Sequence, residues 1–154
     1  MSNVRMYLPP SGMPDGAAAV WVPRKINYRD GNRPCRPGDT VYWLEWWLWN
    51  YWHHIYEYRA DFAEDSYAYK YVKWHVPQHM PSVASRHVWT IDKVEAVQVK
   101  NINYQQAKAC GFEGYIALLA SEIITAEEEL QIYLDTNYPD LSMNIWGWLI
   151  NKGD

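Results

Sequence analysis

The sequence predicts an α+β domain in which strands come first, short helices follow and a last strand closes the sheet. The strongest strand signal is the β-branched and aromatic run from Val41 to Trp49, whereas helix signals are confined to residues 104–136. A final apolar run at 144–150 returns the chain to a strand. Strands followed by helices are typical of α+β architecture, and we expect a partly closed sheet.

Length and charge limit what the chain can be. A chain of 154 residues can bury its own core, so we expect a single domain over 1–154, with an irregular segment at 1–24. Six of the nine prolines lie within residues 1–38, which favours loops and turns there. A net charge of −4 argues against an extended basic surface for nucleic acid but leaves room for a nucleotide pocket.

Cysteine usage and hydropathy indicate a cytoplasmic protein. Cys35 and Cys110 are the only cysteines, and two do not make a disulfide framework, so we expect free thiols. No secretory signal is visible, and no apolar run approaches the ~20 residues that a membrane helix needs. We therefore expect no membrane partner.

Aromatic content is the unusual feature of the composition. The chain is tryptophan-rich, with 10 Trp and 13 Tyr against 2 Phe. Trp and Tyr combine a large flat face with a polar group, which suits wet pockets, interfaces and platforms on which bases stack. The alternative for each of these residues is that it fills the core.

The run at 41–49 predicts one central strand. Alternation places Trp43, Glu45 and Trp47 on one face, and the opposite face is also apolar, so both faces should be covered. A carboxylate among large rings is costly unless it is paired or hydrogen-bonded. Glu45 is therefore half of a structural ion pair or a pocket group that reads a ligand donor.

Three more strands are predicted at 56–60, 69–76 and 86–99, the last with a bulge near Asp92-Lys93 that shifts the alternation. Connections should lie at 50–54 and 63–66.

Two helices are predicted after the strands. Residues 104–110 read as a short helix that ends at Gly111. A capping box begins at Thr125 and predicts a helix at 127–136. We expect this helix to end there because Asn137 and Pro139 follow it.

Motifs for common chemistries are missing from the sequence. His75 and His79 have helical spacing for a metal, but Pro77 lies between them, and we expect neither a metal site nor a cofactor. No Walker loop, GxGxxG or GxSxG is present. Arg86 follows a proline-stiffened loop and could bind an oxyanion or phosphate; its alternative is a salt bridge to Glu45 or Asp61.

Five segments in chain order carry a resemblance to a known family. They are 38–47 (Gly-Asp-Thr-Val-Tyr-Trp-Leu-Glu-Trp-Trp), 58–61 (Tyr-Arg-Ala-Asp), Trp74 with 79–86 (His-Met-Pro-Ser-Val-Ala-Ser-Arg), 106–111 (Gln-Ala-Lys-Ala-Cys-Gly) and 144–148 (Asn-Ile-Trp-Gly-Trp). Together they resemble the motifs of ASCH-type proteins of the PUA-like superfamily that bacteriophages encode. The resemblance implies a partly closed β-barrel with flanking helices, related to an RNA-binding domain.

Relatives in that family include a ribonuclease and an amidohydrolase that deacylates a modified cytidine. The amidohydrolase uses a Lys and a Thr from one motif and a Glu at the end of the short helix. Lys25 and Arg29 match that motif, but Ile26 and Tyr28 replace its threonines, and the Glu position is Cys110. Neither replacement restores acid–base or nucleophilic chemistry, so the resemblance implies that amidohydrolase activity is absent or altered.

The leading hypothesis is a non-catalytic or weakly catalytic phage or prophage protein that binds a nucleobase, nucleotide or single-stranded RNA in an aromatic pocket. The candidate ligand-binding residues are Lys25, Tyr28, Arg29, Trp43, Glu45, Trp47, Trp74, His79 and Arg86. One alternative is an amidohydrolase or nuclease with Lys25 and Glu45 as catalytic residues. The other is an inhibitor of a host defence protein, or a protein that sequesters a nucleotide signal. The oligomeric state is left open.

Overall fold

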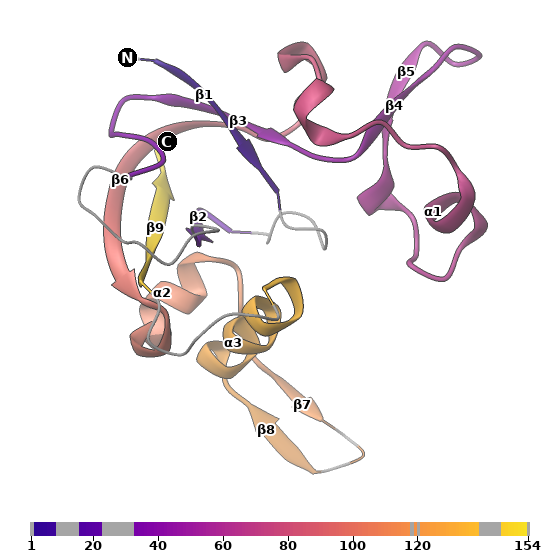
Figure 1. The fold of residues 1–154 in the computed structure, drawn as a ribbon. Helices are drawn as coiled ribbons and strands as arrows, with labels where there is room; N and C mark the ends of the chain where they lie inside the picture. The colour runs from indigo at the N-terminus through magenta and orange to yellow at the C-terminus, as the bar shows by residue number, and fades with distance from the viewer. Residues whose placement is uncertain are drawn as a thin grey trace. The chain divides into compact units, whose positions relative to one another are not determined.

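The computed structural model describes residues 2–8, 16–22, 33–117, 119, 121–138 and 146–153. The chain divides into two compact units, one formed by Met1–Met13 with Thr40–Trp89 and the other by Pro14–Asp39 with Thr90–Asp154. We call them the first and second units. Figure 1 shows the course of the chain through the strands and helices of each.

The first unit is built on extended chain. Strand β1 (Asn3–Tyr7) runs parallel to β3 (Thr40–Leu44), with Asn3 opposite Thr40 and Tyr7 opposite Leu44. On its other side β3 meets the start of β6 (Val88–Gln98), where the Trp43 N–H donates to the His87 carbonyl at 3.0 Å. Val41, Trp43 and Leu44 are buried along β3.

The predicted single strand at 41–49 is wrong, because the chain forms two strands there. β3 ends at Leu44, and β4 (Trp47–Asn50) begins after two intervening residues. The Glu45 N–H points at the Met80 sulfur at 3.5 Å instead of joining a ladder, and Trp47 exchanges backbone hydrogen bonds with His75. The bend lets β4 pair with β5 (Ile55–Tyr58) as an antiparallel hairpin.

The segment at 69–76 was predicted as a strand and is wrong as well. Helix α1 (Tyr67–Tyr71) starts at Ser66, whose hydroxyl accepts the Tyr69 N–H at 3.2 Å. Four residues apart on this helix, the Tyr67 and Tyr71 rings lie 5.1 Å from each other. A capping serine therefore outweighed the β propensity of the aromatic residues.

The second unit carries an antiparallel sheet and two helices. The long strand β6 pairs with β9 (Trp146–Lys152), which pairs with β2 (Ala18–Trp21). The register of β6 shifts between Ile91 and Lys93, which confirms the predicted bulge. The predicted closing strand is present as β9, while residues 144 and 145 lie outside the described part.

Both predicted helices are confirmed. α2 (Tyr104–Ala109) begins with a capping box between Asn103 and Gln106, and Gly111 follows it with a φ of 93°. α3 (Ala126–Asn137) begins at Thr125, whose side chain accepts the Glu128 N–H.

Between these two helices lies a hairpin that the sequence did not indicate. It consists of β7 (Tyr115–Ala117) and β8 (Glu122–Ile124). Figure 1 shows it extending away from α3.

Backbone pairing orders five strands as β1-β3-β6-β9-β2, a mixed sheet that confirms the α+β class. In the described residues the outer strands β1 and β2 do not pair with each other, so no closed barrel forms. None of the helices there is long and apolar enough to cross a membrane.

Gly16 lies where two backbone segments of the second unit approach closely. A Cβ built at this position would lie 2.4 Å from the Cys110 carbonyl carbon and 2.5 Å from the Ala109 oxygen. These are backbone atoms at the end of α2, so they cannot move aside as a flexible side chain does. The adjacent Ala17 N–H donates to that Ala109 oxygen at 2.8 Å.

Gly16→Ala is expected to lower the free energy of unfolding by about 1–3 kcal/mol, because a methyl group is forced against fixed backbone. Chemical denaturation measures the change. Gly153→Ala is the matched control, since its nearest neighbour lies at 3.2 Å, and it should cost clearly less. Equal losses for the two variants would contradict the packing described at Gly16.

Candidate functional site

The loop before β6 holds Arg86 in a fixed position. Two 3-10 turns, Pro77–His79 and Ser82–Ala84, each begin at or just after a proline, which stiffens this part of the first unit. The Ser85 hydroxyl then lies 2.9 Å from the Trp43 carbonyl oxygen and 3.1 Å from that of His87. These contacts place the side chain of the intervening Arg86 beside the end of β3.

Arg86 joins two carboxylates. Its Nε and Nη2 donate to the two Glu45 oxygens at 2.9 and 2.8 Å, a bidentate pair. Its Nη1 donates to both Asp61 oxygens at 2.7 and 2.8 Å. The guanidinium also lies 4.2 Å from the centre of the Tyr58 ring. The salt bridge that the sequence allowed for Arg86 is therefore present, with both of the suggested partners.

The ion pair is buried at one end and open at the other. Only 6% of the Glu45 side chain is exposed, against 31% for Arg86 and 54% for Asp61. The His87 Nε2 lies 4.0 Å from Glu45. Both Glu45 oxygens already accept charge-assisted hydrogen bonds from Arg86, so the buried carboxylate is paired.

Protonation states around the pair are fixed by the same contacts. Partial burial lowers the pKa of Arg86, but hydrogen bonds to Glu45 and Asp61 outweigh it and raise the pKa above the ordinary value. Burial, followed by the nearby Glu45 charge, raises the pKa of Tyr58. The Tyr58 phenol therefore stays protonated and donates to the Ala84 carbonyl.

Aromatic side chains line one face of the β4–β5 hairpin. Because directly opposite residues share a face of the ladder, the pairs Trp47–Tyr58 and Trp49–Tyr56 lie on one side. We call these four residues the aromatic ladder. Ring centres are 6.0 Å apart for Trp47 and Tyr56 and 4.8 Å apart for Trp49 and Tyr56. All four side chains are half-buried, and all but Trp49 pack against the buried cluster of Leu44, Met80 and Ala84.

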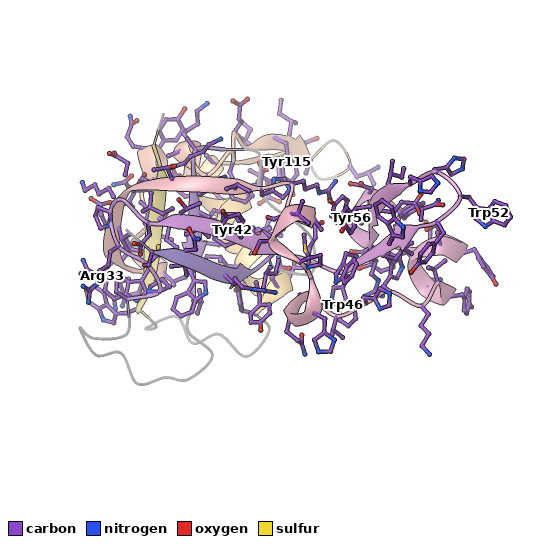
Figure 2. The ribbon with its side chains drawn as sticks, turned by 90° about the horizontal axis from the view of Figure 1, so that it is seen from above. Arg33, Tyr42, Trp46, Trp52, Tyr56 and Tyr115 are labelled. Carbon is purple, nitrogen blue, oxygen red and sulfur yellow. The ribbon has the colours of Figure 1, made fainter. Side chains whose placement is uncertain are left out.

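Aromatic contacts continue past both ends of the ladder. At one end the His75 ring lies 4.8 Å from Trp47. At the other, Tyr51 and His54 pack edgewise on Trp49 at 6.5 and 6.3 Å. Trp52, in the hairpin turn, is 92% exposed and projects outward (Figure 2). An exposed indole next to other aromatic side chains is typical of a surface that binds a ligand or another macromolecule.

The turn of the hairpin is held by its own side chains. The Asn50 Oδ1 accepts the N–H groups of Trp52 and His53 at 2.9 and 3.1 Å, and His54 takes a φ of 53°. From Trp46 to Tyr56 no Lys, Arg, Asp or Glu occurs, so the ladder and the turn are free of formal charge.

The predicted site residues have different environments. Trp47 belongs to the ladder and is anchored by its indole N–H, which donates to the Val76 carbonyl at 3.1 Å. Trp74 is buried, packs on Phe62 and donates to the Ala68 carbonyl at 2.9 Å. His79 is exposed.

Trp43 lies in the core, edge-on to Trp89 at 5.4 Å, and its indole N–H has no hydrogen-bond partner among the described residues. Lys25, Tyr28 and Arg29 lie outside the described residues. The structure therefore brings Glu45 and Arg86 into contact, and a site that includes Lys25 stays a prediction.

Sequence reasoning missed Trp49, Trp52 and Tyr56 as site residues. Alternation along the predicted strand places Trp49 on the same face as Trp47. Which side chains of the returning strand lie beside them follows only from the pairing of β4 with β5, and Trp52 lies in the turn, where alternation gives no signal.

Charge is unevenly divided between the units. Residues 1–13 and 40–89 hold five Lys or Arg, five Asp or Glu and all five His, so their formal charge is zero. Residues 14–39 and 90–154 hold nine basic and thirteen acidic residues and carry the whole net charge of −4. The aromatic ladder thus lies in the neutral part of the chain. In the part that the structure describes, no group of three His, Cys, Asp or Glu could hold a metal ion.

Both cysteines are buried free thiols. Burial, with a smaller contribution from Asp39, raises the pKa of Cys35 to about 11, and burial raises the pKa of Cys110 to about 12. Cys110 holds the position of the amidohydrolase Glu in the resemblance. A thiol that stays protonated does not replace a carboxylate as an acid or base.

We expect neither thiol to react with a disulfide reagent such as DTNB at pH 8 in the native protein, because the thiolate is the reactive form. In the protein unfolded by guanidinium, both thiols should react. Burial keeps both thiols protonated in the folded protein, whereas an unfolded thiol loses its proton near pH 8.5. The contribution of the two thiols to the free energy of unfolding is therefore complete below about pH 8.5 and is lost as the pH rises through 11 and 12. Rapid labelling of the native protein at pH 8 would contradict the described burial.

Arg86→Ala is expected to destabilise the protein by about 3–5 kcal/mol, because it leaves the buried Glu45 carboxylate without its cation. Asp61→Asn is the matched control. It removes a charge from the exposed side of the same guanidinium and should cost about 1 kcal/mol or less. Urea denaturation measures both, and equal small effects would show that the Glu45–Arg86 pair is not an important stabilising contact.

The resemblance to ASCH-type proteins rests on the five sequence segments alone. Comparison with protein-family models, with curated proteins and with solved structures finds no match to this chain.

Proposed function

We propose that this chain is a non-catalytic binding protein that recognises a nucleobase, nucleotide or single-stranded RNA by stacking it on the aromatic ladder. The observation that carries the proposal is the unbroken series of ring contacts from His75 through Trp47, Tyr56 and Trp49 to Tyr51. Stacking of a base on an aromatic side chain contributes about 1–3 kcal/mol and tolerates any base, since every base has a flat face.

Partial exposure of the ladder favours this role over simple core packing. Its rings are half-buried, whereas Trp43 and Trp89 in the same unit are buried almost completely. Exposed Tyr51 and Trp52 extend the aromatic surface past the end of the hairpin. A ligand with more than one base has successive rings on which to stack.

Glu45 and Arg86 act in this proposal chiefly as positioning residues. Arg86 stacks on Tyr58 and is held by Glu45, so the pair fixes the end of the ladder nearest to β3. All three guanidinium nitrogens already donate to Glu45 or Asp61, so a phosphate or carbonyl oxygen reaches Arg86 only by displacing the exposed Asp61 carboxylate. Lys25 and Arg29 remain the proposed cations for a ligand phosphate.

The family assignment is part of the proposal. We propose an ASCH-type, PUA-like protein from a phage or prophage that acts in the host cytoplasm. Five ordered sequence segments support this, and an α+β arrangement with a mixed sheet is compatible with it. Enzymatic alternatives have less support, because the threonine positions are Ile26 and Tyr28 and the Glu45 carboxylate is ion-paired.

Titration of intrinsic tryptophan fluorescence with UMP, AMP and a ten-nucleotide single-stranded RNA tests the proposal. We expect saturable quenching, and Trp49→Ala should weaken binding about 5- to 100-fold, which corresponds to one lost stacking contact. Calorimetry is the second readout, because the variant removes one fluorophore.

Tyr104→Ala is the matched control, since Tyr104 is an exposed aromatic residue of the second unit. Its affinity should equal that of the unmodified protein. No binding at concentrations near 1 mM, or equal losses for the two variants, would sink the proposal. Vesicle binding that depends on Trp52 without any binding of nucleotides or RNA would point to a membrane surface instead.

A further inference from the structure

The β7–β8 hairpin forms no part of the proposed ligand site. Its three residue pairs are Tyr115–Ile124, Ile116–Ile123 and Ala117–Glu122, so Ile116 and Ile123 lie side by side on one face. Among the described residues, β7 and β8 pair only with each other.

Apolar side chains of this hairpin are open to solvent. Ile116 and Ile123 are 64% and 73% exposed, and Leu119 in the turn is fully exposed. An isolated two-stranded hairpin is only marginally stable in water, and three or more strands with an apolar face are needed for stability. The hairpin therefore has both the side chains and the free strand edge that a further strand would cover.

The base of the hairpin is hydrogen-bonded to α3. The Gly114 N–H donates to the Glu129 Oε2 at 2.8 Å, which ties the start of β7 to α3. Gly114 has a φ of 81°, and a Cβ there would lie 2.4 Å from the Ile124 oxygen. These contacts join the base of the hairpin to α3, the helix that follows it (Figure 1).

Charge distinguishes the two edges. β7 has the sequence Tyr-Ile-Ala and no charge, whereas β8 begins with Glu122. Edge strands are commonly protected from pairing by charged residues, and β7 lacks that protection. Two β7 strands that pair antiparallel about Ile116 place Tyr115 opposite Ala117 and Glu113 opposite Leu119, so no like charges meet.

Pairing through β8 would be less favourable. In a β8-β7-β7-β8 sheet the two Glu122 residues are separated by three strand spacings of about 4.8 Å, which exceeds the Debye length of about 8 Å in physiological salt. Direct pairing of two β8 strands would instead bring both carboxylates to neighbouring positions. Of the two hairpin edges, the charge pattern therefore favours β7 over β8 as the edge through which a second copy pairs.

We propose that the β7 edge is a self-association surface, through which two copies of this chain form a four-stranded antiparallel sheet about a two-fold axis. The four isoleucines, Ile116 and Ile123 from each copy, then form one continuous apolar face. An isologous contact of this kind closes at two copies. The proposal does not depend on the proposed ligand.

Sedimentation velocity from about 1 to 500 μM tests the proposal, because a small interface of this kind is expected to be weak. We expect a reversible monomer–dimer equilibrium in the unmodified protein. Ile116→Lys should shift it to monomer by at least tenfold in the dissociation constant, since it places two ammonium groups opposite each other.

Ile132→Lys is the matched control, because Ile132 is an exposed isoleucine of α3 outside the hairpin. It should leave the equilibrium unchanged, and circular dichroism should show that both variants are folded. Ile116→Cys should form an intermolecular disulfide on mild oxidation, whereas Ile132→Cys should not.

Salt separates self-association from binding to a basic partner. The second unit carries the net charge of −4, so screening should strengthen the contact between two copies. A protein that is monomeric at every concentration would overturn the proposal. So would a dimer that Ile116→Lys leaves intact, or one that dissociates as sodium chloride is raised from 0.1 to 0.5 M.

Discussion

A buried carboxylate is the constraint on which the first unit depends. Glu45 is almost fully enclosed, so its charge must be matched in place, and Arg86 matches it with two parallel hydrogen bonds. Meeting that requirement ends β3 at Leu44 and starts a new strand at Trp47. The ion pair therefore decides where the sheet stops and where the aromatic hairpin begins.

The break between β3 and β4 determines which side chains meet on the β4–β5 hairpin. Once β4 leaves the main sheet, Trp47 and Trp49 pair with Tyr58 and Tyr56 instead of being enclosed between two layers. Tyr58 covers the guanidinium and ties the hairpin to the ion pair, while Trp52 reaches solvent at the turn. Uncharged rings, supported by a charged pair at one end only, suit the flat face of a base better than a string of phosphates.

The second unit is organised differently. It holds the acidic surplus and the apolar core around Leu130 and Leu134, with α2 and α3 packed as capped helices. Its strand β7 is a short, uncharged edge strand, and the Gly114 N–H at its base donates to Glu129 of α3. The aromatic ladder belongs to the part of the chain without net charge, and β7 belongs to the acidic part.

What the sequence determined by itself was local: the Thr125 cap of α3, the end of α2 before Gly111, the bulge in β6, the closing strand and the cost of leaving the Glu45 carboxylate unpaired. Each depends on neighbours within a few residues or on the cost of burying one charge. Tertiary structure decided the break at Glu45, the helix at Tyr67–Tyr71 and the pairing that assembles the aromatic ladder. Those depend on contacts between residues far apart in the chain, such as Glu45 with Arg86 and Trp47 with His75, which alternation along a single segment cannot reveal.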